Sequence, residues 1–325
     1  MGEILDLAAQ NLISPVILSF VLGLAAAFFR SDLSFPEAIA KGMSLYLLFA
    51  IGFKGGAGVA AHGVDARLVS ALVAGVVLSL SLPLLAFALL RSMTKMSVTD
   101  AAAVAAHYGS ISIVTFVAAT ALLASQGIAS EGYMVAVAAA MEAPAIASAL
   151  WLVARRGGGE RMNAELVREI MLNGSIVLLV GSFLIGWITG DDGLKQIESF
   201  IVSPFKGVLC LFLLDMGLVA GRGLRSGQAA LSGGAIVFAL IMPPLGACFG
   251  LLAALLLGLS LGGTVLMMVL AASASYIAVP AAMRVALPEA NPTLSLSLSL
   301  GITFPFNLMV GIPLYLAVAA VFVAA

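Results

Sequence analysis

Residues Ala105 to Phe116 read AAHYGSISIVTF, and this stretch decides how the chain can fold. Gly109 and the hydroxyl residues after it interrupt an apolar run that is otherwise long enough to cross a membrane. Glycine and serine loosen a helix, and lipid offers no water to the backbone groups that an unwound segment frees. An unwound segment at this depth is therefore expected only where it lines protein or a watered cavity.

The composition of the whole chain indicates a lipid environment. Hydrophobic residues make up 62% of the 325 residues, charged residues make up 10%, and the mean hydropathy is +1.17. Soluble domains carry about 25% charged residues, so an integral membrane protein is predicted. The long apolar runs favour an all-α polytopic protein over a β-barrel of short alternating strands. A net charge of −1 without a basic stripe argues against a nucleic-acid partner.

Ten apolar segments are expected to span the membrane, because each holds about 20 mostly apolar residues. Lys and Arg gather in the loops opposite the termini and are sparse on the other face. The positive-inside rule therefore places both termini outside a bacterial-type inner (plasma) membrane. The segments are 13–29, 36–53, 68–91, 98–124, 131–154, 170–189, 200–221, 229–257, 263–286 and 293–323.

The chain contains a weak internal repeat. Residues 47–56 (LLFAIGFKGG) resemble residues 212–221, and residues 99–115 resemble residues 264–280, both at a spacing of 165 residues. Each half then holds five helices. Because five is odd, the second half enters the membrane from the opposite face, so two inverted repeats are predicted.

The predicted organisation follows from this repeat. Residues 1–154 form the first inverted repeat, residues 155–169 form a cytoplasmic linker, and residues 170–325 form the second repeat. Core and scaffold (or gate) subdomains would each draw on both repeats.

The two halves carry interruptions at matching places, Gly109–Ser112 in the fourth segment and Ser273–Pro280 in the ninth. Pro280 cannot donate a backbone hydrogen bond, and Gly109 loosens the backbone on its own side. Matched interruptions of this kind point to a transporter binding site. The alternative is that the small residues only allow close helix packing.

The chemistry of two broken helices suits an anion beside a cation. The second half-helices begin with unpaired N–H groups and a partial positive charge, which attract an anion. The first half-helices end in free carbonyls, which suit a hard cation such as sodium. The hydroxyls that can contact either ion belong to Ser110, Ser112, Thr115, Ser273 and Ser275.

Four further polar residues lie inside apolar segments. Glu142 precedes Pro144 in the fifth segment, where a carboxylate is costly and is a functional candidate. Three roles remain open for it: a sodium ligand, a partner that orients the broken helix, or a protonated structural group. Thr303 and Asn307 occupy a comparable place in the tenth segment. His107 precedes the first break, where it can bond a freed carbonyl or relay protons.

Four stretches carry a resemblance to a known family. They are IGFKGG in the second segment, YGSISIVT in the fourth, MEAPA in the fifth and ASASYIAVPAAMRVALPEANP in the ninth and beyond. With them the chain resembles the SbtA-type sodium-dependent bicarbonate permeases. The resemblance implies a homotrimer of ten-helix protomers, each with a core that holds two crossed broken helices and a scaffold that mediates assembly. It also implies bicarbonate at the crossing, sodium beside it, and alternating access.

Carried over position by position, the resemblance implies the site residues. Substrate would contact Gly109, Ser110, Ile111, Ser112, Ser275, Tyr276, Ile277 and Ala278. Sodium would be held by Ser112, Thr115, Ser273, Ser275 and Glu142, with His107, Thr303 and Asn307 in support. Cyanobacterial members carry an acidic residue where this chain has Tyr276, and a longer linker. The sodium geometry and docking of a PII-like regulator therefore stay open.

We expect a secondary active transporter, not an enzyme, that couples sodium to bicarbonate without an organic cofactor. The main alternative is a sodium-coupled symporter of another small anion, such as a short organic acid. Sodium/proton exchange is less favoured, because neither break holds adjacent carboxylates. An intramembrane enzyme with His107 as base for Ser110 or Ser112 would lack a visible third orienting group.

Overall fold

The computed structural model describes residues 13–63, 66–142, 144–155, 168, 172, 174–227, 231–276, 279–280, 283 and 287–323. Within these ranges all regular secondary structure is helical. Among the described residues, eight helical stretches are long and apolar enough to cross a membrane. Two further apolar helices, Pro15–Phe28 and Leu261–Ala272, are shorter. Of the predicted linker, only Arg155 and Arg168 are among the described residues. The predicted site residues Ile277 and Ala278 lie outside the described residues.

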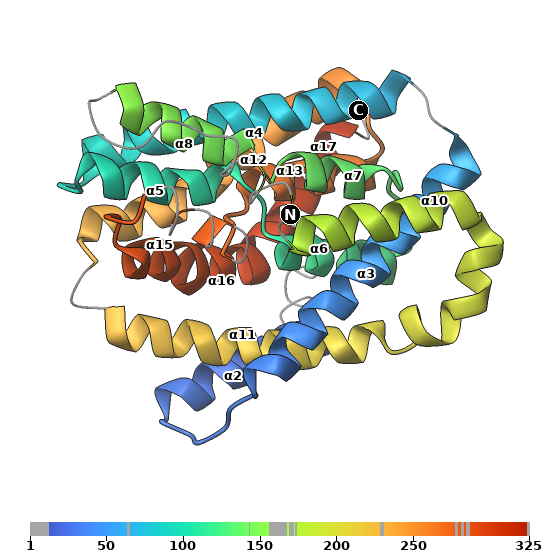
Figure 1. Ribbon diagram of the computed structural model, residues 1–325, viewed down its shortest axis with the longest axis horizontal. Helices are drawn as coiled ribbons and strands as arrows, with labels where there is room; N and C mark the ends of the chain where they lie inside the picture. The colour runs from blue at the N-terminus through green and yellow to red at the C-terminus, as the bar shows by residue number, and fades with distance from the viewer. Residues whose placement is uncertain are drawn as a thin grey trace.

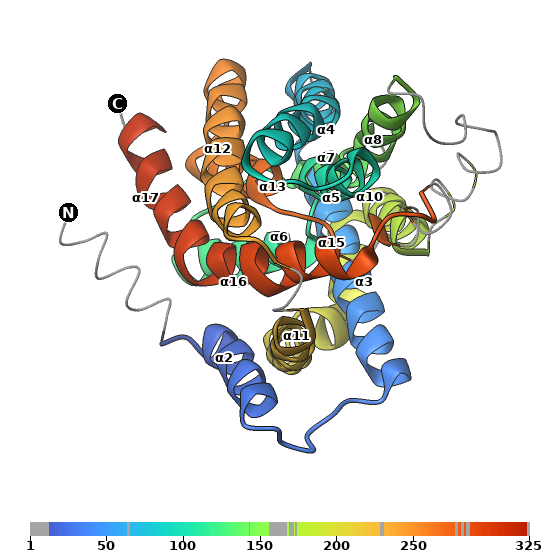
Figure 2. The same cartoon turned by 90° about the vertical axis from the view of Figure 1, so that its left-hand side faces the viewer.

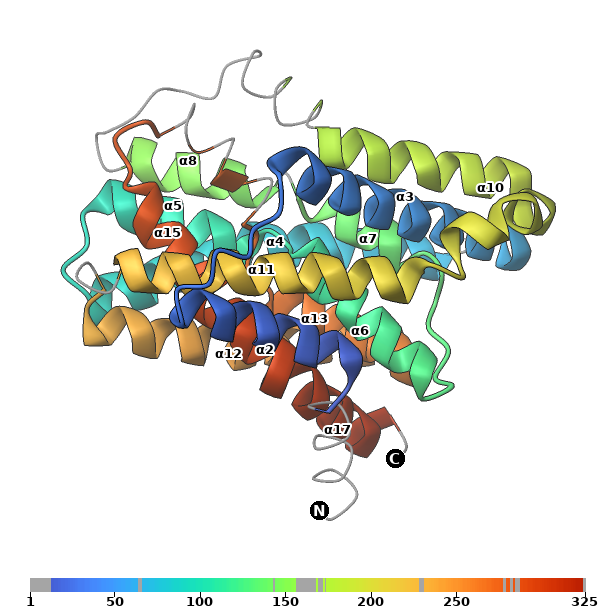
Figure 3. The ribbon, with the colours of Figure 1, turned by 90° about the horizontal axis from the view of Figure 1, so that it is seen from below.

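Two closely packed helix pairs lie on one side of the molecule. Helix α3 (Glu37–His62) packs along α10 (Gly174–Ile201), and α2 (Pro15–Phe28) packs along α11 (Phe205–Gly227). Figure 3 shows both pairs running side by side. In Figure 2, α2 and α11 lie below the remaining helices, and α3 extends down from the level of α10. Of the described helices, these four form one layer and the others form a second layer.

Glycine allows the close approach within each pair. A Cβ atom at Gly186 would lie 2.1 Å from the carbonyl oxygen of Phe53, and one at Gly23 would lie 2.0 Å from that of Leu214. Gly186 follows Gly23 by 163 residues, and Leu214 follows Phe53 by 161. The two pairs therefore share one kind of contact, a glycine against a main-chain carbonyl. In one pair the glycine comes from the second half of the chain, and in the other pair it comes from the first half.

Helix boundaries differ from prediction in these pairs. The second segment was predicted to end at residue 53, but α3 continues to His62. Lys54 therefore lies inside the helix, half-buried, with its ammonium 4.6 Å from the centroid of the Phe205 ring. This contact with an aromatic face shelters the charge, so the helix need not end there. The sixth segment runs past residue 189 to Ile201 with a kink at Gly190, whose φ of 56° favours glycine.

The other layer holds the two interrupted regions. Helix α5 (Val98–Gly109) and helix α6 (Ile113–Ser125) are separated by residues 110–112, of which Ser110 and Ser112 have an extended conformation. Helix α13 (Leu261–Ala272) ends at Ser273, which is also extended. Figure 1 shows α6 and α13 in the middle of the molecule.

Helices α5 and α13 begin and end alike. Each has 12 residues, and Ser97 and Ser260 cap their first turns through the side-chain oxygen. Ser110 has φ −86° and ψ 171°, and Ser273 has φ −84° and ψ 163°. Both the N-caps and the C-caps are 163 residues apart, not the 165 inferred from sequence similarity. The difference arises because alanine-rich sequences match equally well when shifted, whereas caps mark definite helix ends.

Two long helices support the interrupted ones. Helix α4 (Ala66–Met93) packs on α5, and α12 (Gly233–Leu257) packs on α13. A Cβ at Gly109 would lie 2.1 Å from Pro83 Cγ on α4, so this glycine serves close packing as well as the break.

The last segment of each half is also irregular. Helices α7 (Met134–Ala140) and α8 (Pro144–Arg155) are separated by a turn that contains Glu142. After α15 (Pro292–Leu298), wide π-helical turns at Ser299–Thr303 and Asn307–Gly311 flank α16 (Phe304–Phe306), and α17 (Ile312–Val323) follows. Wide turns of this kind inside helices occur frequently at functional sites.

Candidate functional site

The two interruptions meet inside the protein. The main-chain N–H of Ser112 donates to the hydroxyl oxygen of Ser273 at 2.9 Å. The main-chain N–H of Ser275 donates to the carbonyl oxygen of His107 at 2.8 Å. All four residues are buried. Two direct hydrogen bonds therefore join segments that lie more than 160 residues apart in the sequence.

His107 and Ser275 are bonded in both directions. Nδ1 of the imidazole lies 2.5 Å from the carbonyl oxygen of Ser275. A carbonyl can only accept, so Nδ1 carries the hydrogen. Together with the bond from the Ser275 N–H, this contact pins the last turn of α5 to the second interruption.

A hydroxyl cluster caps the start of α6. The Ser112 hydroxyl oxygen accepts from the Thr115 N–H at 3.2 Å and from the Thr115 hydroxyl at 2.9 Å. The Ser273 hydroxyl donates to the Leu270 carbonyl at 3.0 Å. These bonds hold three hydroxyl oxygens around the meeting point of the interruptions.

Glu142 reaches the first interruption through a serine. The Ser110 hydroxyl donates to Oε2 of Glu142 at 3.2 Å, and Glu142 is only 6% exposed. The Ser79 hydroxyl donates to the Met141 carbonyl at 2.7 Å and holds the turn that carries Glu142. Within the described residues Glu142 has no Lys or Arg partner. A buried carboxylate without a cationic partner fits either a bound cation or a protonated acid.

The tenth segment supports the ends of the broken regions. Nδ2 of Asn307 donates to the carbonyl oxygen of Ala272, the last residue of α13, at 2.9 Å. The Tyr315 hydroxyl donates to Oδ1 of Asn307 at 2.9 Å. Asn307 therefore satisfies a carbonyl that the end of α13 leaves open.

Thr303 contacts α5 away from the interruption. Its hydroxyl lies 2.7 Å from the Tyr108 hydroxyl and donates to a carbonyl of α12 at 2.8 Å. Tyr108 and Tyr315 were not among the predicted site residues. The available signal was that a tyrosine inside an apolar segment needs a partner for its hydroxyl.

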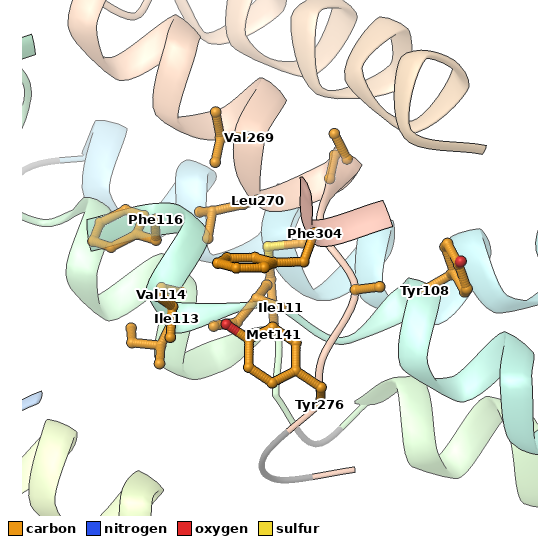
Figure 4. Packing of buried hydrophobic residues seen from close by; sticks show 14 of the residues in the cluster. Tyr108, Ile111, Ile113, Val114, Phe116, Met141, Val269, Leu270, Tyr276 and Phe304 are labelled. Atoms are coloured by element: carbon orange, nitrogen blue, oxygen red, sulfur yellow. The ribbon is translucent and has the colours of Figure 1, made fainter. Parts of the chain in front are cut away.

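Tyr276 has an unusual environment. Its ring packs edge-on against Phe304 with ring centroids 5.3 Å apart, and Figure 4 shows both rings. In the part of the chain that the structure describes, its hydroxyl is the only enclosed side-chain nitrogen or oxygen without a hydrogen-bond partner. It lies near the Ser112 hydroxyl without meeting hydrogen-bond geometry. An enclosed, unpaired hydroxyl is destabilising by about 1–3 kcal/mol, so the Tyr276 hydroxyl is a candidate to contact a ligand.

The structure thus brings together nearly all the described residues of the predicted site. Thr303 is the exception, because it contacts α5 and α12 rather than the interruptions. No group of three His, Cys, Asp or Glu side chains suited to a metal occurs among the described residues. The oxygens present are hydroxyls, carbonyls and one carboxylate, a set that suits a hard cation rather than a transition metal.

The comparison with known families agrees with this chemistry. The family profile described as the Na+-dependent bicarbonate transporter superfamily matches residues 15–320. No curated protein matches the chain. The matched range covers all the described helices up to α17 and both interruptions. The chain therefore belongs to the Na+-dependent bicarbonate transporter superfamily and is a multi-pass membrane transporter, not an enzyme.

Proposed function

We propose that this protein carries bicarbonate and sodium together, and that both ions bind where the interruptions after α5 and α13 meet. The observation that carries this proposal is the direct bond from the Ser112 N–H to the Ser273 hydroxyl. It brings a helix start, two helix ends and a cluster of hydroxyls to one buried point. Such a point holds small ions without needing a large charged cluster.

The anion would be bound mainly by main-chain groups. Helix α6 begins at Ile113, directly after the interruption, and the first N–H groups of a helix have no acceptor within it. These groups and the helix dipole favour a negative charge. The unpaired hydroxyl of Tyr276 would add one more donor. Bicarbonate has three oxygens, which can accept these bonds.

Sodium would be bound by neighbouring oxygens. The candidates are the hydroxyls of Ser112, Thr115, Ser273 and Ser275 and the carboxylate of Glu142, which is tied to the first interruption by Ser110. A bound cation would raise the affinity for the anion, and by linkage the anion would raise sodium affinity equally. This reciprocity couples the two ions.

The proposed architecture is a ten-helix inverted repeat with broken fourth and ninth helices. Residues 1–154 and 170–325 would be the repeats, joined by a cytoplasmic linker, with both termini outside a bacterial inner membrane. The matched caps of α5 and α13 and the exchanged glycine contacts support this arrangement. Helices α2, α3, α10 and α11 would form the scaffold of a homotrimer, against which the core shifts during alternating access.

The test is uptake of labelled bicarbonate into proteoliposomes with and without an inward sodium gradient. We expect accumulation only with the gradient, and competition from unlabelled bicarbonate above that from formate or acetate. Uptake that ignores sodium would contradict the proposal. Stronger competition from a short organic acid would identify another small anion as the substrate.

A further inference from the structure

A small cavity lies beside α5, next to the interruptions but outside the hydroxyl cluster. It has a volume of about 100 Å³ and is lined by Ala103 and His107 of α5, by Pro280, and by Pro288 and Ser295 near the start of α15. Pro288 is exposed and His107 is 1% exposed. The cavity therefore reaches from an exposed loop to the imidazole that is bonded to the second interruption.

His107 has a second ring nitrogen, Nε2, besides the bonded Nδ1. Because Nδ1 donates to the Ser275 carbonyl, Nε2 of the neutral ring has a lone pair and can accept a hydrogen bond. Among the described residues no hydrogen bond to Nε2 is found, and His107 is only 1% exposed. His107 lines this cavity, so a ligand bound in the cavity can reach the imidazole.

The matching helix has no such residue. The position 163 residues after His107 is Leu270 in α13, although α5 and α13 share length, N-cap and C-cap. A broken helix of this type therefore forms without histidine at this place. The imidazole needs an explanation other than the break itself.

We propose that the cavity is a staging site for hydrogen carbonate, in which Nε2 of His107 accepts the O–H of the anion. The inference rests on the proposed function and names a residue that determines its specificity. Hydrogen carbonate has an O–H to donate, whereas formate, acetate and nitrate have none. The buried Ser295 hydroxyl can donate to a charged oxygen of the same anion. A volume of about 100 Å³ equals the share of about three water molecules, enough for an anion of four heavy atoms.

Two substitutions of His107 distinguish the role of Nδ1 from the role of Nε2. In His107→Asn, the amide nitrogen can replace Nδ1 at the Ser275 carbonyl, but nothing replaces Nε2. In His107→Gln, the longer side chain brings an amide oxygen to the position of Nε2. The measurement is sodium-dependent uptake of labelled bicarbonate into proteoliposomes, with formate and nitrate as competitors.

In His107→Asn we expect competition by formate and nitrate against the remaining bicarbonate uptake to strengthen about tenfold relative to the wild type, which corresponds to about 1.4 kcal/mol. His107→Gln is expected to keep most of the preference. Ser295→Ala removes a cavity hydroxyl that makes no recorded bond to either interruption, and it is expected to weaken the preference in the same direction. Ser299→Ala is the control, because its buried hydroxyl donates to the Ser295 carbonyl within the helix and does not line the cavity.

An unchanged preference in folded His107→Asn would overturn the inference. If that variant does not fold, an unchanged preference in Ser295→Ala overturns it. Wild-type protein that shows no sodium-dependent uptake would instead contradict the proposed function itself, so the two failures are distinguishable.

Discussion

The main-chain N–H of Ser112 and the hydroxyl of Ser273 lie 2.9 Å apart, although 161 residues separate them in the sequence. This bond joins the two interruptions without any charged side chain. A second connection between the halves runs between His107 and Ser275, where the Ser275 N–H donates to the His107 carbonyl and Nδ1 of His107 donates to the Ser275 carbonyl. Binding an ion at this point would therefore act on both halves at once.

Ser273→Ala should weaken binding of both ions. The substitution leaves the buried Ser112 N–H without an acceptor, at about 1–3 kcal/mol. We expect the sodium and bicarbonate half-saturation values to rise about tenfold in uptake assays. Ser182→Ala is the matched control, because its buried hydroxyl also donates to a carbonyl three residues earlier and has no second recorded partner. Equal effects of the two substitutions would contradict the role of the Ser112–Ser273 bond.

Tyr276→Phe should weaken bicarbonate binding without lowering the thermal stability of the protein. The hydroxyl has no hydrogen-bond partner among the described residues, so its removal should leave the thermal unfolding temperature unchanged or slightly higher. If the hydroxyl donates to the anion, the bicarbonate half-saturation should rise about tenfold or more, since a hydrogen bond to a charged group contributes about 1.5–3 kcal/mol.

The opposite pattern is expected for Tyr46→Phe. The Tyr46 hydroxyl donates to the Phe200 carbonyl between α3 and α10, far along the chain from the interruptions. Its loss should lower stability by about 1 kcal/mol and leave bicarbonate affinity unchanged. Unchanged affinity in Tyr276→Phe would exclude the tyrosine from the anion site.

Glu142→Gln tests which role the carboxylate plays. The amide keeps the shape and one acceptor for the Ser110 hydroxyl but removes the negative charge. A sodium ligand predicts a rise of at least tenfold in sodium half-saturation. A protonated structural acid predicts no change, because glutamine resembles it closely.

Glu131→Gln is the control for the loss of charge. Glu131 accepts from the Ser260 N–H at 2.7 Å and from its hydroxyl at 2.9 Å, at the start of α13. This substitution should reduce thermal stability through the lost charge-assisted bonds and leave sodium half-saturation as in the wild type.

Two glycine substitutions should shift stability in opposite directions. In Gly109→Ala the new Cβ would lie 2.1 Å from Pro83 Cγ, and overpacking of this kind destabilises by about 1–3 kcal/mol. In Gly207→Ala nothing lies within 4 Å, and alanine favours the helix by about 1 kcal/mol. Thermal unfolding in detergent measures both changes. A neutral Gly109→Ala would show that α4 and α5 do not pack this closely.

The number of sodium ions carried with each bicarbonate ion can be tested by changing the membrane potential. One sodium ion with one bicarbonate ion moves no net charge, so the membrane potential, worth about 2.3 kcal/mol per charge per 100 mV, would contribute nothing. A tenfold sodium gradient alone would supply about 1.4 kcal/mol. We expect uptake rates that do not change when a potassium diffusion potential is imposed. A current that follows the potential would rule out this ratio.

The helical class and the family were predictable because they depend on local chemistry. A run of about 20 apolar residues can only be a buried or lipid-facing helix, and the stretches YGSISIVT and ASASYIAVP supply the loosening residues and the family resemblance. Boundaries were less predictable where a distant side chain shelters a charge. Helix α3 continues past Lys54, because the Phe205 ring lies against the Lys54 ammonium and shelters its charge.

The sequence by itself determined the solvent of this protein, the helical class and the residue types near the interruptions, because each follows from neighbours along the chain. The tertiary structure alone decided the interval of 163 residues between matched caps, the bond of His107 to Ser275, the bond of Asn307 to Ala272, and the unpaired hydroxyl of Tyr276. A hydrogen bond needs two groups within about 3 Å in a definite orientation. For groups far apart in the sequence, that separation is set by how whole helices pack and not by any pattern that the chain carries locally.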